Sequence, residues 1–413
     1  MKAASNIYIL GGSQTDFARN WAREGLGIYE MFKDSLETAV TNSGIDPAQI
    51  EVGHVGNFVG ELFAGQGLLG GFFAHVYPEL NGIPTARHEA ACASGSLAVL
   101  AAMRDIEAGH YNVACVLGLE LMRNVNGKVG AEYLGSAAWA GKEATDCDYP
   151  WPFMFDRITQ EYEQRYGINS DHLARIAEIN FTNAKANINA QTRNWQFSEG
   201  SFSQDDDLNP VIEGRVRKHD CGQVTDGAAC LILASESAAK QYAQDHNIKL
   251  DDIPRIKGWG HRSAAMLLEQ KLEMSKAGGL MFPHAAATLT DACQRAGFAK
   301  PEDLSGLETH DCFSVTEYMA IDHAGLTAPG ESWQAVEDGR ICRDGQFPIN
   351  ASGGLIGLGH PVGATGVRMV LDCAKQVTGR AGHYQIPNAE NMLTFNVGGS
   401  TTTCASFVVG VGR

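Results

Sequence analysis

"NASGGLIGLGHPVGATG", residues 350–366, places eight glycine and alanine residues around a single His–Pro pair. Glycine at this density lets the backbone pass close to a flat or bulky group, and Pro361 fixes the backbone of the turn that presents His360. A histidine on a rigid turn is a candidate general base. The alternative is a histidine that only caps the turn. The stretch therefore predicts a glycine-lined turn built to present His360.

A second stretch, "HEAACASGSLAVLAAMRDIEAG" (88–109), places Cys92 at or just before the start of a helix that ends near Gly109. The unpaired N–H groups and the dipole at a helix N-terminus stabilise a thiolate, so we expect the pKa of Cys92 to lie below its reference value of about 8.5. A buried structural cysteine is the alternative. The stretch makes Cys92 a candidate nucleophile.

The stretch "THDCFS" (309–314) follows an expected strand, so His310 and Cys312 would lie at its C-terminal end, where α/β proteins commonly place their sites. Side chains two residues apart on an extended backbone share one face, and both would point into one cavity. Core packing or a fortuitous metal-like pair would leave the same pattern, although this pair alone is not a zinc signature.

Consecutive glycines in "NVGGSTTTCASFVV" (396–409) precede a terminal strand. Backbone N–H groups that glycine leaves free can point at a developing oxyanion. An ordinary glycine turn is the alternative here. The stretch predicts a turn with backbone donors near the site.

Short apolar runs alternate with helix-like segments along the chain, a pattern that indicates an α/β fold. The expected strands are 6–12, 113–120, 229–235, 307–313 and 405–411, and the clearest helices are 27–45 and 285–298. The segment 123–218 has fewer strand signals and reads as an insertion or lid. A Gly/Ser-rich turn leads into an apolar helix twice, at 93–103 and at 352–373, which suggests an internal duplication.

Composition excludes several classes of function. The formal charge of −16 gives no global basic field, which argues against nucleic acid and anionic membranes as partners. The ten cysteines lack CxxC spacing, so we expect neither a disulfide framework nor a metal site. The first residues lack a signal-type apolar stretch, and no run reaches the length of a membrane span. We expect a cytoplasmic protein.

Together these stretches resemble the thiolase superfamily over nearly the whole length, because "GHPVGATG" follows an "ACASG" cysteine and "HDCF" lies between them. The "HDCF" form resembles the branch of sterol-carrier-protein-2-type thiolases and related acetyl-CoA acetyltransferases. The resemblance implies two similar α/β/α/β/α layered halves with an inserted loop domain, usually in dimers or tetramers. The implied division is an N-terminal half (1–122, completed by 219–254), a loop domain (123–218) and a C-terminal half (255–413).

The chain departs from most thiolases near its C-terminus. Their Cys-x-Gly motif supplies the acid/base for the substrate α-carbon, but here the slot reads Asn396–Val397–Gly398. The resemblance implies that Cys312 takes that role and that Cys92 is the nucleophile. It also implies that His360 accepts the proton of Cys92.

The same resemblance implies acyl-CoA and CoA as substrates, with no bound cofactor. His310 and His360 would stabilise the enolate oxygen, and the Cys92 and Gly398 N–H groups would hold the tetrahedral oxyanion. The stretch "GRVRKHD" (214–220) concentrates Arg215, Arg217 and Lys218 where related enzymes contact the nucleotide. A solvated turn is the alternative for that stretch. A partner protein in a larger complex is a further possibility.

Two other functions fit part of the pattern. A decarboxylating condensing enzyme of the ketosynthase type would also use Cys92, His310 and His360, but it needs no second thiol such as Cys312. A non-catalytic acyl-CoA-binding or scaffold subunit would have no reason to keep all four polar residues. Acyl-enzyme formation from acetyl-CoA, compared with malonyl-CoA, would separate these readings.

Overall fold

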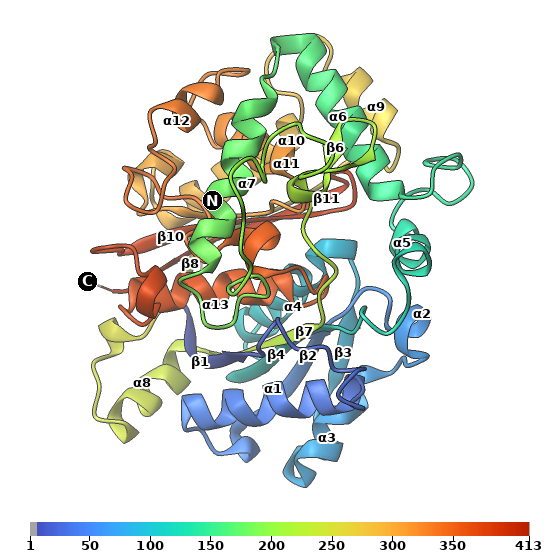
Figure 1. The fold of residues 1–413 in the computed structure, drawn as a ribbon. Coiled ribbons are helices and arrows are strands. Elements are labelled where there is room, and N and C mark those ends of the chain that lie inside the picture. The colour runs from blue at the N-terminus through green and yellow to red at the C-terminus, as the bar shows by residue number, and fades with distance from the viewer. Residues whose placement is uncertain (1–5, 413) are drawn as a thin grey trace.

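The computed structural model describes residues 6–412, and its nine-stranded sheet divides into two groups of strands (Figure 1). The first group has the order β3 (Thr85–His88), β2 (Val52–Gly56), β4 (Val113–Glu120), β7 (Gly227–Ala234) and β1 (Ile7–Gln14). The second continues with β8 (Arg255–Ser263), β11 (Thr403–Gly410), β10 (Asn391–Gly398) and β9 (Leu307–Thr309).

Strand directions repeat between the two groups. β1 runs antiparallel to β7, which is antiparallel to β4, which is parallel to β2. β8 is likewise antiparallel to β11, which is antiparallel to β10, which is parallel to β9. Between residues 6 and 412, the two groups of strands pair with each other through Ile7–Ile256 and Tyr8–Arg255. The expectation of two similar halves is therefore confirmed.

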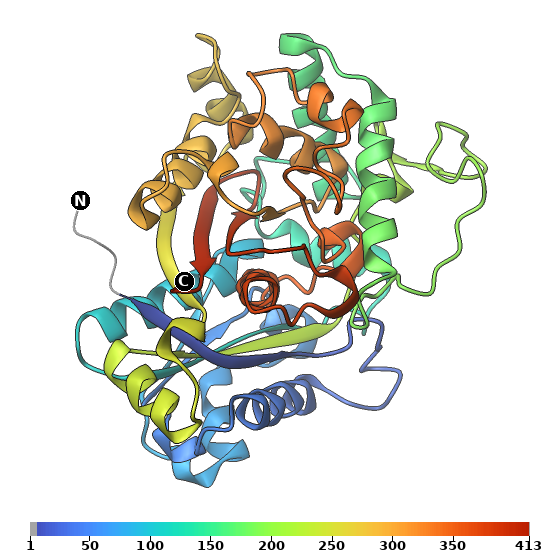
Figure 2. The same ribbon diagram turned by 90° about the vertical axis from the view of Figure 1, so that its left-hand side faces the viewer.

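Helices complete five layers, and two of them fill the centre (Figures 1 and 2). α4 (Ser94–Glu107) and α13 (Thr365–Val377) pack against each other, and α13 contacts strands of both groups. α1 (Ile28–Ser43) covers the outer face of the first group, and α10 (Pro283–Ala296) covers that of the second. The central layer therefore brings the "ACASG" and "GHPVGATG" stretches together.

Close backbone contact explains one of the glycines at this junction. A Cβ on Gly118 would lie 2.3 Å from the carbonyl oxygen of Gly363. Such a contact is too short for any side chain, so only glycine lets the loop before α13 rest directly on β4.

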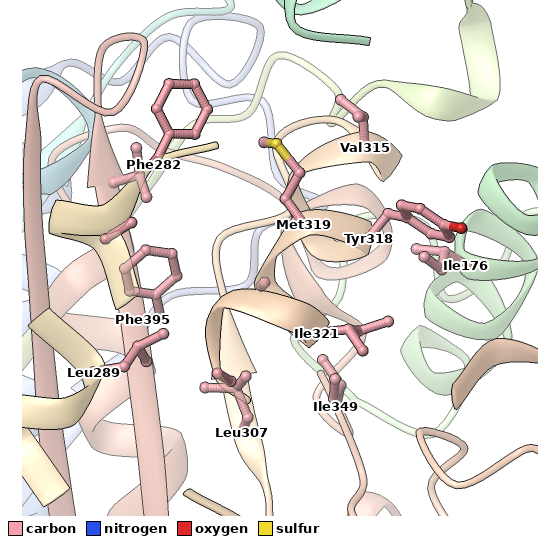
Figure 3. Close-up of a cluster of buried hydrophobic side chains, with 14 of the residues drawn as sticks. Ile176, Phe282, Leu289, Leu307, Val315, Tyr318, Met319, Ile321, Ile349 and Phe395 are labelled. Atoms are coloured by element: carbon pink, nitrogen blue, oxygen red, sulfur yellow. The ribbon is translucent and has the colours of Figure 1, made fainter. Parts of the chain in front are cut away.

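The segment between β4 and β7 contains α5 (Gly127–Gly135), α6 (Pro150–Tyr166), α7 (Ser170–Ala184) and the small hairpin β5 (Val211–Glu213) and β6 (Val216–Arg217). Its helices α6 and α7 pack on α11 (Ser314–His323), and Figure 3 shows Ile176 of α7 close to Tyr318 of α11. The segment therefore covers the second half. Its predicted bounds, 123–218, stay a prediction.

Shorter helices lie around this frame: α2 (Gly60–Ala64), α3 (Phe72–Val76), α8 (Glu236–Asp245), α9 (Leu268–Met274) and α12 (Trp333–Glu337). A π-helical turn covers Gly354–Leu358 in the glycine-rich loop. Across residues 6–412, no helix has both the length and the apolar character that a membrane span requires.

Candidate active site

One cavity of about 350 Å³ is lined by Cys92, His310, Cys312 and His360, so the structure brings all four predicted catalytic side chains together. The Cys92 Sγ and one ring nitrogen from each histidine lie within 4.8 Å of one another. The two imidazole rings are perpendicular, with centroids 5.2 Å apart. These side chains come from three loops that are far apart in the sequence.

Cys92 lies in a 3-10 turn (Ala91–Ala93), and α4 begins just after it at Ser94. Burial raises the pKa of its thiol to about 12, and the nearby Glu120 acts in the same direction. The N–H groups of Cys92 and Gly399 oppose this by hydrogen bonding to the sulfur. The predicted lowering of the Cys92 pKa is wrong, because desolvation outweighs the donors at the helix start.

Glu120 fixes the wall behind the nucleophile. Its fully buried carboxylate accepts hydrogen bonds from four groups: Asn57 Nδ2 and the backbone N–H groups of residues 58, 59 and 363. Burial raises the pKa of Glu120 to about 7 against the effect of these donors. The carboxylate ties the end of β4 to the loop after His360.

His360 is prepared to accept a proton. Its Nδ1 lies 2.7 Å from the Thr365 Oγ1, whose hydroxyl donates to the Pro361 carbonyl oxygen. The oxygen therefore accepts from Nδ1–H, which leaves the Nε2 lone pair free. Within the described residues Nε2 is buried and has no hydrogen-bond partner. Burial and the cationic Arg368 lower the pKa of His360 to about 3, so the ring is neutral.

His310 carries its proton on the other nitrogen. The Asn396 Nδ2 donates to His310 Nδ1 over 3.1 Å, and the Asn396 Oδ1 accepts from Ser96 Oγ over 2.8 Å. This pair of bonds orients the buried amide, so the neutral imidazole holds its proton on Nε2. Burial, His360 and Arg368 keep the pKa of His310 well below its usual value. His310 is thus a hydrogen-bond donor through Nε2, whereas His360 is a base through Nε2.

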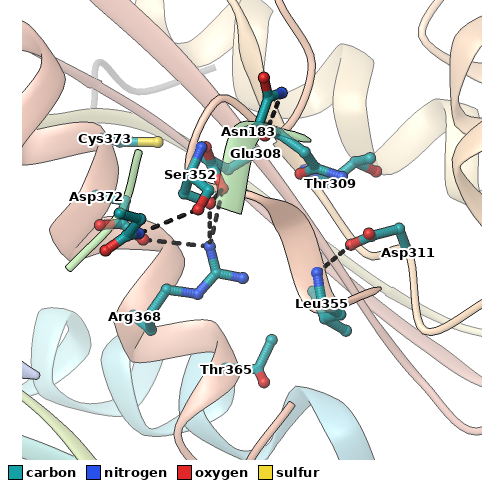
Figure 4. Close-up of polar contacts among 12 residues, drawn as sticks. Asn183, Glu308, Thr309, Asp311, Ser352, Leu355, Thr365, Arg368, Asp372 and Cys373 are labelled. Atoms are coloured by element: carbon teal, nitrogen blue, oxygen red, sulfur yellow. Dashed lines mark hydrogen bonds and ion pairs between the residues drawn. The ribbon is translucent and has the colours of Figure 1, made fainter. Parts of the chain in front are cut away.

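The positive charge of a buried arginine, Arg368, lowers the pKa of both rings, and Figure 4 shows its contacts with Glu308 and Asp372. Arg368 Nη1 lies 2.8 Å from a Glu308 carboxylate oxygen and 3.2 Å from one of Asp372, and none of the three side chains is exposed. This group was not predicted from the sequence. An arginine four residues before an aspartate, among the apolar residues 367 and 369–371 of the central helix, was the available signal.

The carboxylate of Asp311 joins the "HDCF" loop to the glycine-rich loop. Its carboxylate accepts from the Leu355 N–H at 2.5 Å and from the Ile356 N–H at 3.1 Å, which holds the π-helical turn against the "HDCF" loop (Figure 4). Gly354 has φ +61°, and a Cβ there would lie 2.3 Å from Asp311 Oδ2. Single π turns frequently mark functional sites.

Cys312 is 9% exposed, and its Sγ lies 3.8 Å from the Thr316 Oγ1. Burial raises the pKa of its thiol well above the usual value, and Cys92 adds to this effect. Strand β9 ends at Thr309, so the predicted strand alternation does not place Cys312. The bonds of Asp311 and the start of α11 place it instead.

The predicted coenzyme contacts are only partly brought to this cavity. Lys218 lines it, but Arg215 and Arg217 line a neighbouring cavity and pair with Glu163 and Asp206. The role of the two arginines as coenzyme contacts therefore stays a prediction.

The residue after the predicted oxyanion donor Gly398 also lies at the cavity. Gly398 is the last residue of β10, and its neighbour Gly399 lines the cavity with its N–H on the Cys92 sulfur. Gly399 has φ +63°, which turns the chain out of the strand. Gly399 is therefore a candidate oxyanion donor beside Gly398, whose predicted role stays a prediction.

Comparisons with known proteins agree with this geometry. Residues 7–197 match the family described as "Thiolase, N-terminal domain", and residues 268–411 match "Thiolase C-terminal domain-like". The solved Ltp2-ChsH2(DUF35) aldolase aligns over 100% of both chains with a TM-score of 0.78 and 19% identity. Human mitochondrial 3-ketoacyl-CoA thiolase in complex with CoA aligns over 100% of this chain and 99% of its own, with a TM-score of 0.71 and 15% identity. Both likenesses show the fold.

Curated relatives cover the chain from end to end. The acetyl-CoA acetyltransferase of Methanocaldococcus jannaschii is 31% identical, over 96% of this chain and 97% of that protein. The acetyl-CoA acetyltransferase of Methanothermobacter thermautotrophicus is 28% identical, over 97% of this chain and 98% of that protein. Human sterol carrier protein 2 is 26% identical, over 95% of this chain and 70% of that protein. With both halves matched and a relative above 30% identity, the chain belongs to the thiolase family.

Proposed function

We propose that the chain is a thiolase, an acyl-CoA C-acyltransferase that forms or cleaves 3-ketoacyl-CoA through an acyl-enzyme on Cys92. The observation that carries the proposal is one cavity holding two thiols and two neutral histidines in opposite tautomers. A ketosynthase would have no use for Cys312, and a scaffold would have no use for the four groups together. Both alternatives are less favoured.

The first half-reaction uses His360 as the base. In thiolysis its Nε2 takes the proton of Cys92, and the sulfur attacks the 3-keto carbon of the substrate. We assign the oxyanion to the N–H groups of Cys92 and Gly399, since both already bond to the sulfur. The C2–C3 bond then breaks, which leaves an acyl-enzyme and the enolate of acetyl-CoA.

Cys312 and His310 act on that enolate. The Cys312 thiol gives its proton to the α-carbon, and its raised pKa keeps it in the protonated form that this step needs. His310 Nε2–H donates to the enolate oxygen. The Cys312 thiolate then takes the proton of an incoming CoA thiol, which attacks the acyl-enzyme and releases acyl-CoA, while His360 returns its proton to the departing Cys92 thiolate. Synthesis follows the same steps in reverse.

CoA thioesters are the proposed substrates, and the residues present fit them. Lys218 is the cationic side chain in the lining and can meet a coenzyme phosphate. Apolar groups such as Leu134, Trp151 and Phe155 form much of the remaining wall and suit pantetheine and an acyl chain. The chemistry needs no bound cofactor, because CoA itself carries the reacting group.

Intact mass after incubation with acetyl-CoA tests the proposal. We expect wild type to gain one acetyl group and Cys92→Ala to gain none, while Cys147→Ala, a control outside the cavity, gains one. Malonyl-CoA alone should neither load the enzyme nor lose CO₂. Decarboxylation of malonyl-CoA would favour a ketosynthase, and no loading by either thioester would favour a binding subunit.

The assembly and location are also proposals. We propose a homodimer or homotetramer, which the free edge of strand β3 at the end of the sheet supports. A partner protein is supported by the solved structure that pairs Ltp2 with ChsH2. We propose the cytoplasm as the compartment, which the ten free cysteines of the described residues support.

A further inference from the structure

The turn Gly399–Thr402, which joins β10 to β11, carries more backbone strain than a hairpin needs. Thr401 has φ +64°, a left-handed conformation that a β-branched residue rarely adopts. Strained backbone persists only where the surroundings hold it, and it gathers at functional sites. The same turn begins with Gly399, whose N–H bonds to the Cys92 sulfur.

Lys271 of α9 forms hydrogen bonds with this turn. Its Nζ donates to Ser400 Oγ at 2.8 Å, to Thr402 Oγ1 at 2.9 Å and to the Met266 carbonyl oxygen at 3.3 Å. All three N–H groups of the ammonium are therefore used. The side chain is only 4% exposed, and these three partners are neutral oxygens.

Burying a cation among neutral oxygens is unfavourable, because the charge loses its hydration without gaining an anionic partner. Burial lowers the pKa of Lys271 to about 8, while Glu143 and Cys404 act to raise it. His284 faces the same turn and donates from Nε2 to the Thr401 carbonyl oxygen at 2.8 Å. An apolar side chain could fill this space without that penalty, so the lysine serves to hold its hydrogen-bond partners in place.

The position of α9 is itself fixed from the cavity side. Glu143 accepts from the Leu268 N–H at 2.7 Å and from the Trp139 N–H at 3.0 Å. It thereby joins the first turn of α9 to the segment that follows Ala137, which lines the cavity. Lys271 is thus held at one end by α9 and at the other by the turn.

We propose that Lys271 is a positioning residue that holds the Gly399–Thr402 turn so that the Gly399 N–H faces the thioester oxygen. This inference rests on the proposed function, because it assigns Gly399 to the oxyanion of that reaction. Lys271 itself does not line the cavity. Its loss should therefore slow the steps that create an oxyanion and spare those that do not.

Two reactions of the same thiol separate these steps. Acetylation of Cys92 by acetyl-CoA passes through an oxyanion, whereas alkylation by iodoacetamide displaces iodide and creates none. We expect Lys271→Met to slow acetylation by about 10²-fold, the usual loss when one oxyanion donor is removed, and to change alkylation by less than about twofold. Lys276→Met, the same change at an exposed site beside α9, should leave both rates unchanged.

Thr402→Val provides a milder variant if Lys271→Met does not fold, because it removes one acceptor and keeps the shape. It should slow acetylation in part and again spare alkylation. Lys271→Arg, which keeps cation and donors, should recover part of the acetylation rate. Equal acetylation in wild type and folded Lys271→Met, or an equal loss of both reactions in a folded variant, would overturn the inference. Failure of wild type to acetylate would instead refute the proposed function.

Discussion

At the scale of single residues, neighbours give two chemically identical side chains different roles. Thr365 accepts from His360 and frees its Nε2, whereas Asn396 donates to His310 and leaves a proton on its Nε2. The sequence pointed to both histidines and to the missing thiol at position 396. It could not assign the tautomers, because these depend on contacts between residues up to 86 positions apart.

Long-range ¹H–¹⁵N NMR of histidine-labelled protein measures the tautomers directly. At pH 7 we expect His310 to be neutral with its proton on Nε2 and His360 to be neutral with its proton on Nδ1. His310→Gln and His360→Gln identify the two signals among 13 histidines. The same tautomer in both rings, or a protonated ring in either, would contradict the assignment.

Replacement of His360 tests its role as the base. His360→Gln keeps a polar side chain but cannot take a proton, so acetylation of Cys92 should fall by about 10²–10⁴-fold. Alkylation should fall as well, since it also needs the thiolate. His383→Gln changes an exposed histidine and serves as the control. An unchanged rate of alkylation in His360→Gln would remove the residue from this role.

At the scale of elements, apolar periodicity located those that carry the core. The expected helices 27–45 and 285–298 correspond to α1 (Ile28–Ser43) and α10 (Pro283–Ala296), and the expected strand 113–120 is β4. The strand 307–313 ends early at Thr309, because the buried carboxylate of Asp311 bonds to the loop before His360. β2 was missed, since "VGHVG" is too short and too rich in glycine to signal a strand.

One junction of three elements should make stability depend on pH. Glu317 on α11 accepts from Asn180 on α7 and from Asn350 in the glycine-rich loop, and it is fully buried. Burial, followed by the nearby Asp311, raises its pKa to about 8. The folded state therefore keeps a proton that the unfolded chain releases near pH 4.3. This contribution to stability is full below that pH and is lost as the pH rises toward 8.

Urea unfolding of wild type and Glu317→Gln at several pH values checks this dependence. The difference in unfolding free energy between the two proteins should fall by about 1.4 kcal/mol per pH unit between pH 5 and 7.5. Glu331→Gln, at an exposed position, should show no such trend. A difference that stays constant with pH would mean that Glu317 is already ionised in the folded protein.

At the scale of the whole molecule, the duplicated strand order creates the site. Each half contributes a loop and a central helix, and the catalytic side chains meet where α4 and α13 lie between the two groups of strands. Resemblance to a family made this architecture predictable from motifs. The sequence does not show that Arg215 and Arg217 pair with Glu163 and Asp206, because these partners lie far from them along the chain or in a separate loop, and their role toward the coenzyme stays a prediction.

The central claim is that Cys312 replaces the thiol missing at Asn396 as the acid/base at the α-carbon. Exchange of acetyl-CoA methyl protons in D₂O, followed by NMR alongside the intact mass of the enzyme, tests it most directly in wild type and Cys312→Ala. We predict that Cys312→Ala still acquires one acetyl group on Cys92, while methyl exchange falls by about 10²–10⁴-fold. Methyl exchange in Cys312→Ala at close to the wild-type rate would contradict the claim.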